Sequence, residues 1–295
     1  MVYICADDYG LCESTTKHIQ ECIDAGALNK VSIFVNFDPV DPEEIEKNKD
    51  IALSLHLNLV EGRCMADPSE VDLIADENGN LRHTFGGLFK LGLLHPKKLE
   101  EQAYKEIRAQ VLSWKSILPE GMPFRIDGHQ HTHMIPSIFK ALVRVLEEED
   151  INLKHIRIPA EPLYPFITTP SLYFTYGAVN IIKQWTLNFL WMLNKHQAKK
   201  HHIHTSYFFG ILFSGKMDED RVMKILPKYT RIAEKHGKDV EVLFHPGYSD
   251  ESGNEFSGKN VAFKHFYSSD NRKTEFDSVM KISKRSELHA LHRKR

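Results

Sequence analysis

The sequence lacks an excess of charge of either sign. Its 295 residues include 38 lysines and arginines against 40 aspartates and glutamates, and the formal net charge is -2 at pH 7. Proteins that hold polyanions by electrostatics carry a marked basic excess. We therefore expect no nucleic-acid partner.

Cysteine is scarce and follows no pattern. Cys5, Cys12, Cys22 and Cys64 show no CxxC spacing, which favours free, packed thiols over a disulfide framework or a zinc knuckle. The first residues, MVYICADDYG, lack the basic start, the apolar stretch and the small-residue cleavage site of a secretory signal. We therefore expect a cytoplasmic protein.

The sequence also has no uninterrupted apolar run long enough to cross a bilayer. The most apolar segment, YGAVNIIKQWTLNFLWML at residues 176–193, is broken by Asn180, Lys183, Gln184 and Asn188. We predict no membrane span and a packed or interface helix here. A helix lying on a membrane surface is the alternative, and a homodimer also stays open.

What the sequence does contain is an alternation of short β-rich runs with helical patterns. The runs are VYICA, KVSIFVNF, IALSLHLNL, FRIDGHQH, HIRIPAE, SYFFGILFS and VEVLFHPGY. This rhythm is typical of repeated βα units and predicts the α/β class. No repeat and no Pro/Ser-rich linker marks a boundary, so we predict a single domain over residues 1–295.

Two longer excursions, at about residues 61–95 and 161–204, follow predicted strand ends. In a barrel such βα excursions wall or cover the mouth. Within the first, Asn78-Gly79 predicts a hairpin turn. A basic tail follows at about residues 281–295, which we interpret as an amphipathic helix or a frayed end.

Polar and apolar residues alternate within four of the runs. In IALSLHLNL, Leu53, Leu55 and Leu57 share one parity, whereas Ser54 and His56 share the other. Successive strand side chains point to opposite faces, so one face packs and the other carries His56. The polar parity of the other three runs comprises Arg125, Asp127, His129, His131 and His133, then His155, Arg157 and Glu161, then Glu241 and His245.

These ionisable residues gather toward the C-terminal ends of the runs, where parallel α/β proteins place their chemistry. A buried polar group with no partner costs about 1 to 3 kcal/mol, so several that point the same way predict an occupant. The occupant is a metal, a substrate or ordered water. Separate core histidines, each satisfied on its own, are the alternative.

Two adjacent carboxylates, Asp7 and Asp8, end the first run before a glycine turn. Like charges this close resist joint ionisation unless a cation lies beside them. The pair therefore suggests one metal ligand and one proton acceptor, although helix-capping aspartates give the same pattern. With His56 and the HxHxH run, it supplies one carboxylate and two imidazoles, which leaves positions on a catalytic metal open for water and substrate.

Taken together and in order, ADDYG, SIFVN, HLNL, DGHQHTHMIPSIF, RIPAE and FHPGY resemble the YdjC-like carbohydrate deacetylase family, typified by chitooligosaccharide deacetylases. The resemblance covers about residues 2–250. It implies a deformed (β/α) TIM-like barrel, related in its site to NodB-type polysaccharide deacetylases. The implied activity is removal of acetyl groups from N-acetylated sugars or oligosaccharides.

The same resemblance implies one divalent metal ion, Mg2+ or Zn2+, with Mn2+ or Co2+ as alternatives. Its ligands match Asp8, His56 and His129 of this chain. The catalytic base of the family matches Asp7, and the histidine of its HP motif matches His245, which would protonate the departing amine.

Three further residues are candidates for substrate binding. Arg157 would orient Asp7 or bind substrate, and Glu161 or His131 would contact sugar hydroxyls. The sequence also departs from the pattern of the chitooligosaccharide enzymes, which have consecutive histidines after the aspartate. Here Gly128 and Gln130 flank His129, and the excursion at 161–204 is longer and more apolar, so the size of the substrate stays open.

Other functions fit parts of the same pattern. Amidohydrolases and histidinol-phosphatase-type phosphoesterases also use HxH at a strand end, but they usually place it in the first strand. A sugar-binding barrel without catalysis would keep the site for structure. A glycosidase would need carboxylates paired across the scissile bond, a role that Asp7 and Glu161 would have to fill.

Overall fold

A computed structural model describes residues 1–37, 41–249 and 266–284. The chain divides into two compact units. Unit 1 comprises Met1–Val31, Ile158–Phe189 and Thr205–Arg295, and unit 2 comprises Ser32–Arg157 and Leu190–His204. The single domain with excursions at 61–95 and 161–204 stays a prediction.

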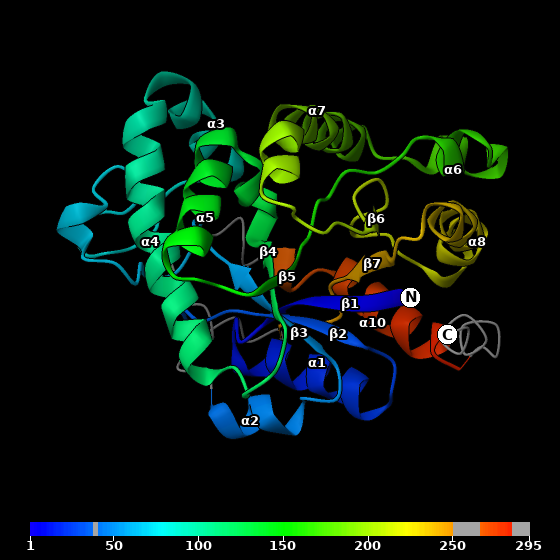
Figure 1. Ribbon diagram of the computed structural model, residues 1–295. Coiled ribbons are helices and arrows are strands. Elements are labelled where there is room, and N and C mark those ends of the chain that lie inside the picture. The colour runs from blue at the N-terminus through cyan, green and yellow to red at the C-terminus, as the bar shows by residue number, and fades with distance from the viewer. Residues whose placement is uncertain (38–40, 250–265, 285–295) are drawn as a thin grey trace. The chain divides into compact units, whose positions relative to one another are not determined.

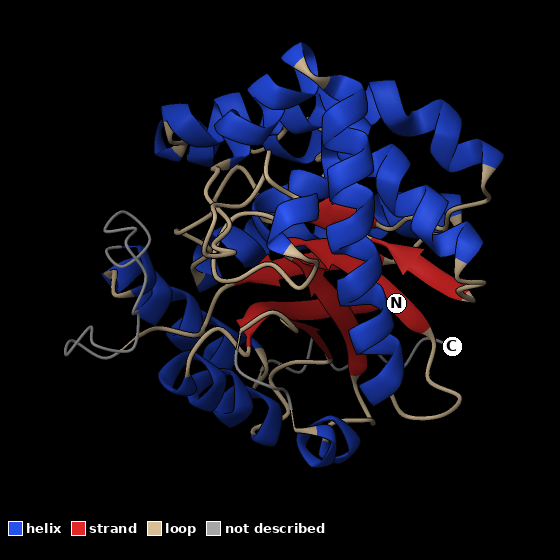
Figure 2. Cartoon of the chain, turned by 90° about the vertical axis from the view of Figure 1, so that its left-hand side faces the viewer, coloured by secondary structure: helices blue, strands red, loops and turns tan. Residues whose placement is uncertain are grey.

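Seven strands form one sheet in the described part of the chain (Figure 1, Figure 2). They are β1 (Val2–Tyr9), β2 (Lys30–Ile33), β3 (Ala52–Leu57), β4 (Phe124–Gly128), β5 (Leu153–Ile156), β6 (Tyr207–Phe209) and β7 (Val240–Phe244). Their order is β5-β4-β3-β2-β1-β7-β6. The parallel sheet curls into a half-barrel, so the predicted α/β class with a deformed TIM-like barrel is confirmed. Each predicted β-rich run overlaps one of these strands.

In unit 1, β1 pairs in parallel with β7, and β7 pairs with β6. The helical elements are α1 (Glu13–Asp24), α6 (Tyr164–Ile167), η3 (Pro170–Thr175), α8 (Glu219–His236) and α10 (Asp270–Ile282). Helix α1 is followed by Gly26 at φ 66, and α8 ends at Gly237 at φ 61. Glycine reaches this left-handed region without a Cβ penalty, which explains why both helices stop there.

A buried ion pair lies in the core of unit 1. Lys30 at the start of β2 donates to Glu241 on β7 at 2.9 Å, and both side chains are almost fully buried. Two charges inside a protein are tolerated only when each satisfies the other. Glu241, assigned by parity to the polar face of its strand, therefore has a structural partner.

In unit 2, β3 pairs in parallel with β4, and β4 with β5. The helical elements are α2 (Pro42–Lys47), η1 (Pro68–Glu70), α3 (Phe85–Leu94), α4 (Pro96–Ile117), η2 (His129–Met134) and α5 (Pro136–Glu148). Helices α4 and α5 lie side by side (Figure 1) and bury Trp114, Ile107, Phe139 and Leu142. Both parities of β3 are buried, as expected for a parallel strand covered on both faces.

The alternation predicted through FRIDGHQHTH is wrong beyond Gly128. Strand β4 ends there, and His129–Met134 is a 3-10 segment in which Gln130 and His131 have φ of 49° and 58°. Left-handed backbone destroys the two-residue periodicity of a strand. His129, His131 and His133 therefore do not share a strand face.

Four further predictions concern smaller features of the chain. The turn at Asn78-Gly79 forms, with Gly79 at φ 79, but only isolated antiparallel bridges flank it. All four cysteines are free thiols, as predicted. Helix α10 ends at Ile282, and residues 285–295 of the predicted basic tail lie outside the described residues. Helix α7 (Ala178–Lys200) covers most of the apolar segment, and none of the described helices is long and apolar enough to span a membrane.

Candidate functional site

The best-defined polar contact of unit 2 joins two neighbouring strands. His56 on β3 and Asp127 on β4 are in register, and Nδ1 of His56 lies 2.6 Å from Oδ1 of Asp127. Both side chains are fully buried. A carboxylate on one ring nitrogen fixes the orientation of an imidazole, an arrangement common among histidines that ligate metals.

Asp127 is itself fixed by two further groups. Ser32 on β2 donates its hydroxyl to Oδ2 of Asp127 at 2.7 Å, and Nη2 of Arg157 lies 3.4 Å from the same oxygen. Arg157, predicted to orient Asp7 or to bind substrate, is fully buried and also donates to the Ser32 hydroxyl. These contacts make Asp127 a rigid support for His56.

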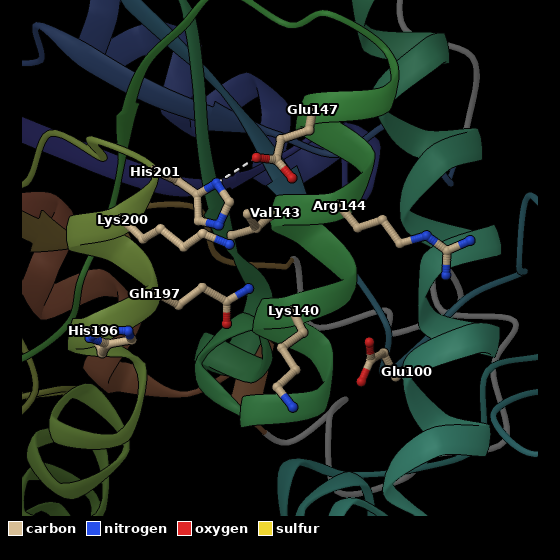
Figure 3. Close-up of a pocket in the computed structure, with 9 residues that line it drawn as sticks. All are labelled: Glu100, Lys140, Val143, Arg144, Glu147, His196, Gln197, Lys200 and His201. Carbon is tan, nitrogen blue, oxygen red and sulfur yellow. Dashed lines mark ion pairs between the residues drawn. The ribbon is translucent and has the colours of Figure 1, made fainter.

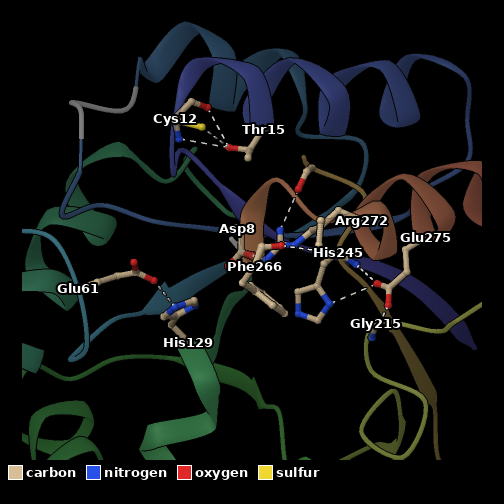
Figure 4. Close-up of polar contacts among 12 residues, drawn as sticks. Asp8, Cys12, Thr15, Glu61, His129, Gly215, His245, Phe266, Arg272 and Glu275 are labelled. Carbon is tan, nitrogen blue, oxygen red and sulfur yellow. Dashed lines mark hydrogen bonds and ion pairs between the residues drawn. The ribbon is translucent and has the colours of Figure 1, made fainter. Parts of the chain in front are cut away.

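His129 lies beside His56. It is the first residue after β4, and the two ring centroids are 5.4 Å apart, with Phe34 packed edge-on against both. Nε2 of His129 contacts Oε1 of Glu61 at 2.7 Å (Figure 4). Unit 2 thus brings together the two imidazoles that were predicted as metal ligands, each with a carboxylate on one nitrogen.

The other two histidines of the motif have different surroundings. His133 is fully buried, its Nε2 contacts the carbonyl of Arg157 at 2.8 Å, and burial lowers the pKa of His133 to about 4. A Cβ on Gly128 would lie 2.4 Å from Nδ1 of His133, which explains the glycine in this motif. His131, a predicted substrate contact, is half-buried.

In unit 1, β1 ends with the two predicted carboxylates. Asp7 and Asp8 are both buried, and Asp8 has φ 74, a strained value for a residue with a side chain. Oδ2 of Asp8 accepts from Nη2 of Arg272 at 2.7 Å (Figure 4). The guanidinium of Arg272 lies over the rings of both Phe266 and Tyr267, and it also donates to the carbonyl of Gly247.

His245 follows β7 and is held by Glu275 of α10. Its backbone N–H donates to Oε2 of Glu275 at 2.6 Å, and its Nδ1 lies 3.3 Å from the same oxygen (Figure 4). The backbone N–H of Gly215 donates to the other oxygen of Glu275. With Nδ1 toward Glu275, Nε2 is the nitrogen of His245 that can exchange a proton with a ligand.

Glu161, the third predicted substrate contact, is fully buried. Its carboxylate accepts the backbone N–H groups of Gly210, Ile211 and Leu212 at 2.6, 2.8 and 2.9 Å. Burial raises the pKa of Glu161 to about 7, against the opposing effect of these three hydrogen bonds. The side chain therefore ties the loop after β6 to the start of the 161–204 excursion.

Buried aspartate and histidine side chains could hold a metal ion. One group of three consists of Asp8, His56 and His129, and a second consists of Asp7, His56 and Asp127. Carboxylate and imidazole donors suit several divalent ions, so this set does not choose among zinc, magnesium, manganese and cobalt. The catalytic, metal and substrate roles of the individual residues stay predictions.

Sequence reasoning missed four supporting residues. Glu61, Arg272 and Glu275 were assigned no role. Asp127 was grouped only with the other polar residues on one face of its predicted strand. The buried positions Arg272 and Glu275 are three apart on α10, which is the spacing of one helix face, but nothing in the sequence says what that face meets. Only the fold shows that these residues hold Asp8 and His245.

The site thus contains a buried histidine-aspartate pair beside a second histidine, on a parallel sheet of the α/β class. Comparison with known sequences gives the family directly. Residues 1–290 match the YdjC-like protein family, so the chain belongs to that family.

Several relatives carry the name carbohydrate deacetylase. The zebrafish protein is 29% identical over 54% of this chain, which spans only 50% of the zebrafish sequence. The mouse protein is 26% identical over 83% of this chain and 77% of its own length. A chitooligosaccharide deacetylase of Yersinia enterocolitica is 23% identical over 85% of this chain and 83% of its own length.

One solved structure is similar over nearly the whole chain. A candidate cellobiose-phosphate cleavage protein from Enterococcus faecalis V583 superimposes with a TM-score of 0.59, covering 95% of this chain and 94% of its own. Its sequence identity is 16%. The likeness therefore shows a shared fold.

Proposed function

We propose that the chain is a metal-dependent hydrolase that removes acetyl groups from N-acetylated sugars or oligosaccharides. Its membership of the YdjC-like family and the names of its relatives support this activity. The observation that carries the proposal is the buried contact of His56 with Asp127 at 2.6 Å, with the ring of His129 beside it. Proteins orient metal-ligating imidazoles in this way.

In this proposal Asp8, His56 and His129 hold one divalent ion, Mg2+ or Zn2+, or alternatively Mn2+ or Co2+. The donor chemistry fits, because one carboxylate and two imidazoles are ligand types that bind these ions. When bound, the ion would polarise the acetamide carbonyl and lower the pKa of a water molecule.

The remaining chemistry falls to residues of the chain. Asp7 would take a proton from the attacking water, which adds to the carbonyl carbon. His245, oriented by Glu275, would give a proton to the nitrogen as the C–N bond breaks. The products are acetate and a free amine on the sugar.

We further propose that His131, Arg157 and Glu161 contribute to substrate binding. His131 is half-buried and has surface to offer a ligand directly, whereas Arg157 and Glu161 are fully buried. We propose a cytoplasmic location, an acetylated sugar as the partner and no nucleic-acid partner.

Acetate release tests the activity. The purified chain is chelated, supplied with each of the four metals in turn, and incubated with N-acetylglucosamine oligomers. We expect acetate and free amines at unchanged oligomer length, and no phosphate from phosphoesters. Shortened sugars would contradict the proposal in favour of a glycosidase. Tight binding of the oligomers by the metal-loaded protein without any acetate would contradict catalysis.

The support that Asp127 gives to His56 makes a separate prediction. Asp127→Asn should weaken metal binding about 10-fold to 100-fold. A neutral amide accepts the hydrogen bond from His56 more weakly than a carboxylate does, so the imidazole is held less firmly. Metal affinity is measured by titration of the chelated protein. Asp50→Asn, at an exposed position, is the matched control and should leave the affinity unchanged. Equal affinities in the two variants would remove His56 from the ligand set.

A further inference from the structure

Helix α7 (Ala178–Lys200) turns apolar side chains toward solvent. Val179, Ile182, Trp185, Phe189 and Met192 are all more than half exposed, from 53% for Phe189 to 72% for Met192. Their spacing of three and four residues places them on one face of the helix. An exposed stripe of this kind marks an interaction surface.

The opposite face of α7 is buried and partly polar. Gln184 and Asn188 both donate to the backbone carbonyl of Glu161, at 3.1 and 3.0 Å. Further along the helix, Asn194 donates to the carbonyl of Met134 at 2.8 Å. These hydrogen bonds fix the rotation of α7, because turning the apolar stripe inward would break all three and leave buried polar groups without partners.

The apolar surface extends onto the elements that precede α7. Leu163, Ile167 and Phe174, from α6 and η3 with their flanking turn, are exposed, and Phe174 is fully so. A hollow of about 250 Å3 opens among Leu163, Tyr173, Trp185 and their neighbours. We call the exposed apolar residues of α6, η3 and α7 that are named above, from Leu163 to Met192, the α6–α7 surface.

Acidic residues are absent from this part of the sequence. From residue 162 to residue 217 there is no aspartate or glutamate, although the whole chain contains 40. The same stretch contains five lysines, and Lys195, Lys199 and Lys200 are exposed at the C-terminal end of α7. The net charge of -2 for the whole chain therefore does not reveal this local basic segment.

The end of α7 also meets α5 within unit 2. There His196, Lys200 and His201 border a hollow of about 440 Å3 together with Lys140 and Arg144 (Figure 3). Two carboxylates line the same hollow, and one of them pairs with His201 at 2.5 Å. Arg144 also pairs with Glu101 and Glu148, so the basic character where the apolar stripe ends comes from the lysines.

We propose that the α6–α7 surface binds the surface of a lipid bilayer that contains anionic lipids. Exposed tryptophan, phenylalanine and aliphatic side chains enter the boundary between headgroups and acyl chains, and lysines beside them attract anionic headgroups. A second copy of the chain fits less well. A symmetric pair joined through α7 would bring together two basic segments that have no carboxylates of their own to offset their repulsion.

Vesicle sedimentation tests the proposal. The full chain is mixed with phosphatidylcholine vesicles, with and without phosphatidylglycerol, and the bound fraction is measured. We expect binding to the anionic vesicles and much weaker binding to phosphatidylcholine alone. Trp185→Ser should lower the partition coefficient into the anionic vesicles about tenfold. Lys199→Gln and Lys200→Gln should each lower it about fivefold.

Two controls remove comparable groups elsewhere. Met65→Ser deletes an exposed apolar side chain outside the α6–α7 surface, and Lys17→Gln deletes an exposed charge on α1. Both should bind vesicles like the parent chain, and all variants should keep the parent's thermal midpoint because the changed positions are exposed. Equal binding by Trp185→Ser and Met65→Ser would overturn the proposal. So would an absence of vesicle binding combined with dimerisation that Trp185→Ser abolishes.

Discussion

Asp7→Asn should retain the metal and lose about a hundredfold to ten-thousandfold in turnover, whereas Asp8→Asn should lose the metal. The expected loss at Asp7 is that of a general base, since an amide cannot take the proton from water. The loss at Asp8 follows from the proposed ligand set, in which Asp8 supplies the one carboxylate. Metal content of the purified variants and acetate release measure the two effects separately.

The choice of asparagine at Asp8 matters. The residue has φ 74, a region that asparagine tolerates better than alanine, and it forms a buried ion pair with Arg272. Asp8→Ala should also lose the metal, but it removes the side-chain oxygen that accepts from Arg272, whereas asparagine keeps an amide oxygen. The alanine variant should therefore unfold more easily. Asp50→Asn is the control for both positions. Unchanged metal content in Asp8→Asn would remove this ligand from the scheme, and full turnover in Asp7→Asn would remove the base.

Lys30→Met should lower the free energy of unfolding by about 3 to 5 kcal/mol. The substitution leaves the carboxylate of Glu241 buried in the core of unit 1 without the ammonium group that lies 2.9 Å away. Chemical denaturation with urea measures the change. A large loss is expected because removing one partner leaves a single buried charge, which is strongly destabilising. Replacing both partners by apolar residues costs much less.

The double variant Lys30→Met with Glu241→Leu separates charge from packing. It removes both charges, so most of the lost stability should return. Lys49→Met, which breaks an exposed ion pair with Glu46, is the matched control and should shift the denaturation midpoint little. If the double variant were as unstable as Lys30→Met alone, packing of the lysine stem rather than the buried charge would account for the effect.

Local patterns predicted the elements of this fold well. The Asn78-Gly79 pair was predicted to form a turn, and Gly79 adopts the left-handed conformation there. The β-rich runs all overlap strands, because alternation and β-branched residues report on burial within a few residues. The error came at His129–Met134, where two consecutive left-handed residues break the periodicity. A pattern of alternating letters cannot reveal such a change of backbone.

The candidate site divides in the same way. Sequence alone selected Asp8, His56 and His129, because carboxylates and imidazoles at strand ends in this order resemble one family's motifs. It could not show that Asp127 holds His56 or that Glu61 contacts His129, since 71 and 68 residues separate the partners. Arg272 is 264 residues from Asp8. Such partners are chosen by the packing of whole elements.

The order of strands and helices, the family motifs and the absence of acidic residues over residues 162–217 are properties of the sequence by itself. They follow from short-range periodicity and composition, which act over one element at a time. The tertiary structure decided which polar side chains support the histidines, and it decided that α7 buries Gln184 and Asn194 while exposing Trp185 and Phe189. The physical reason is that a helix buries the face whose polar groups find hydrogen-bond partners. Those partners lie on other parts of the chain.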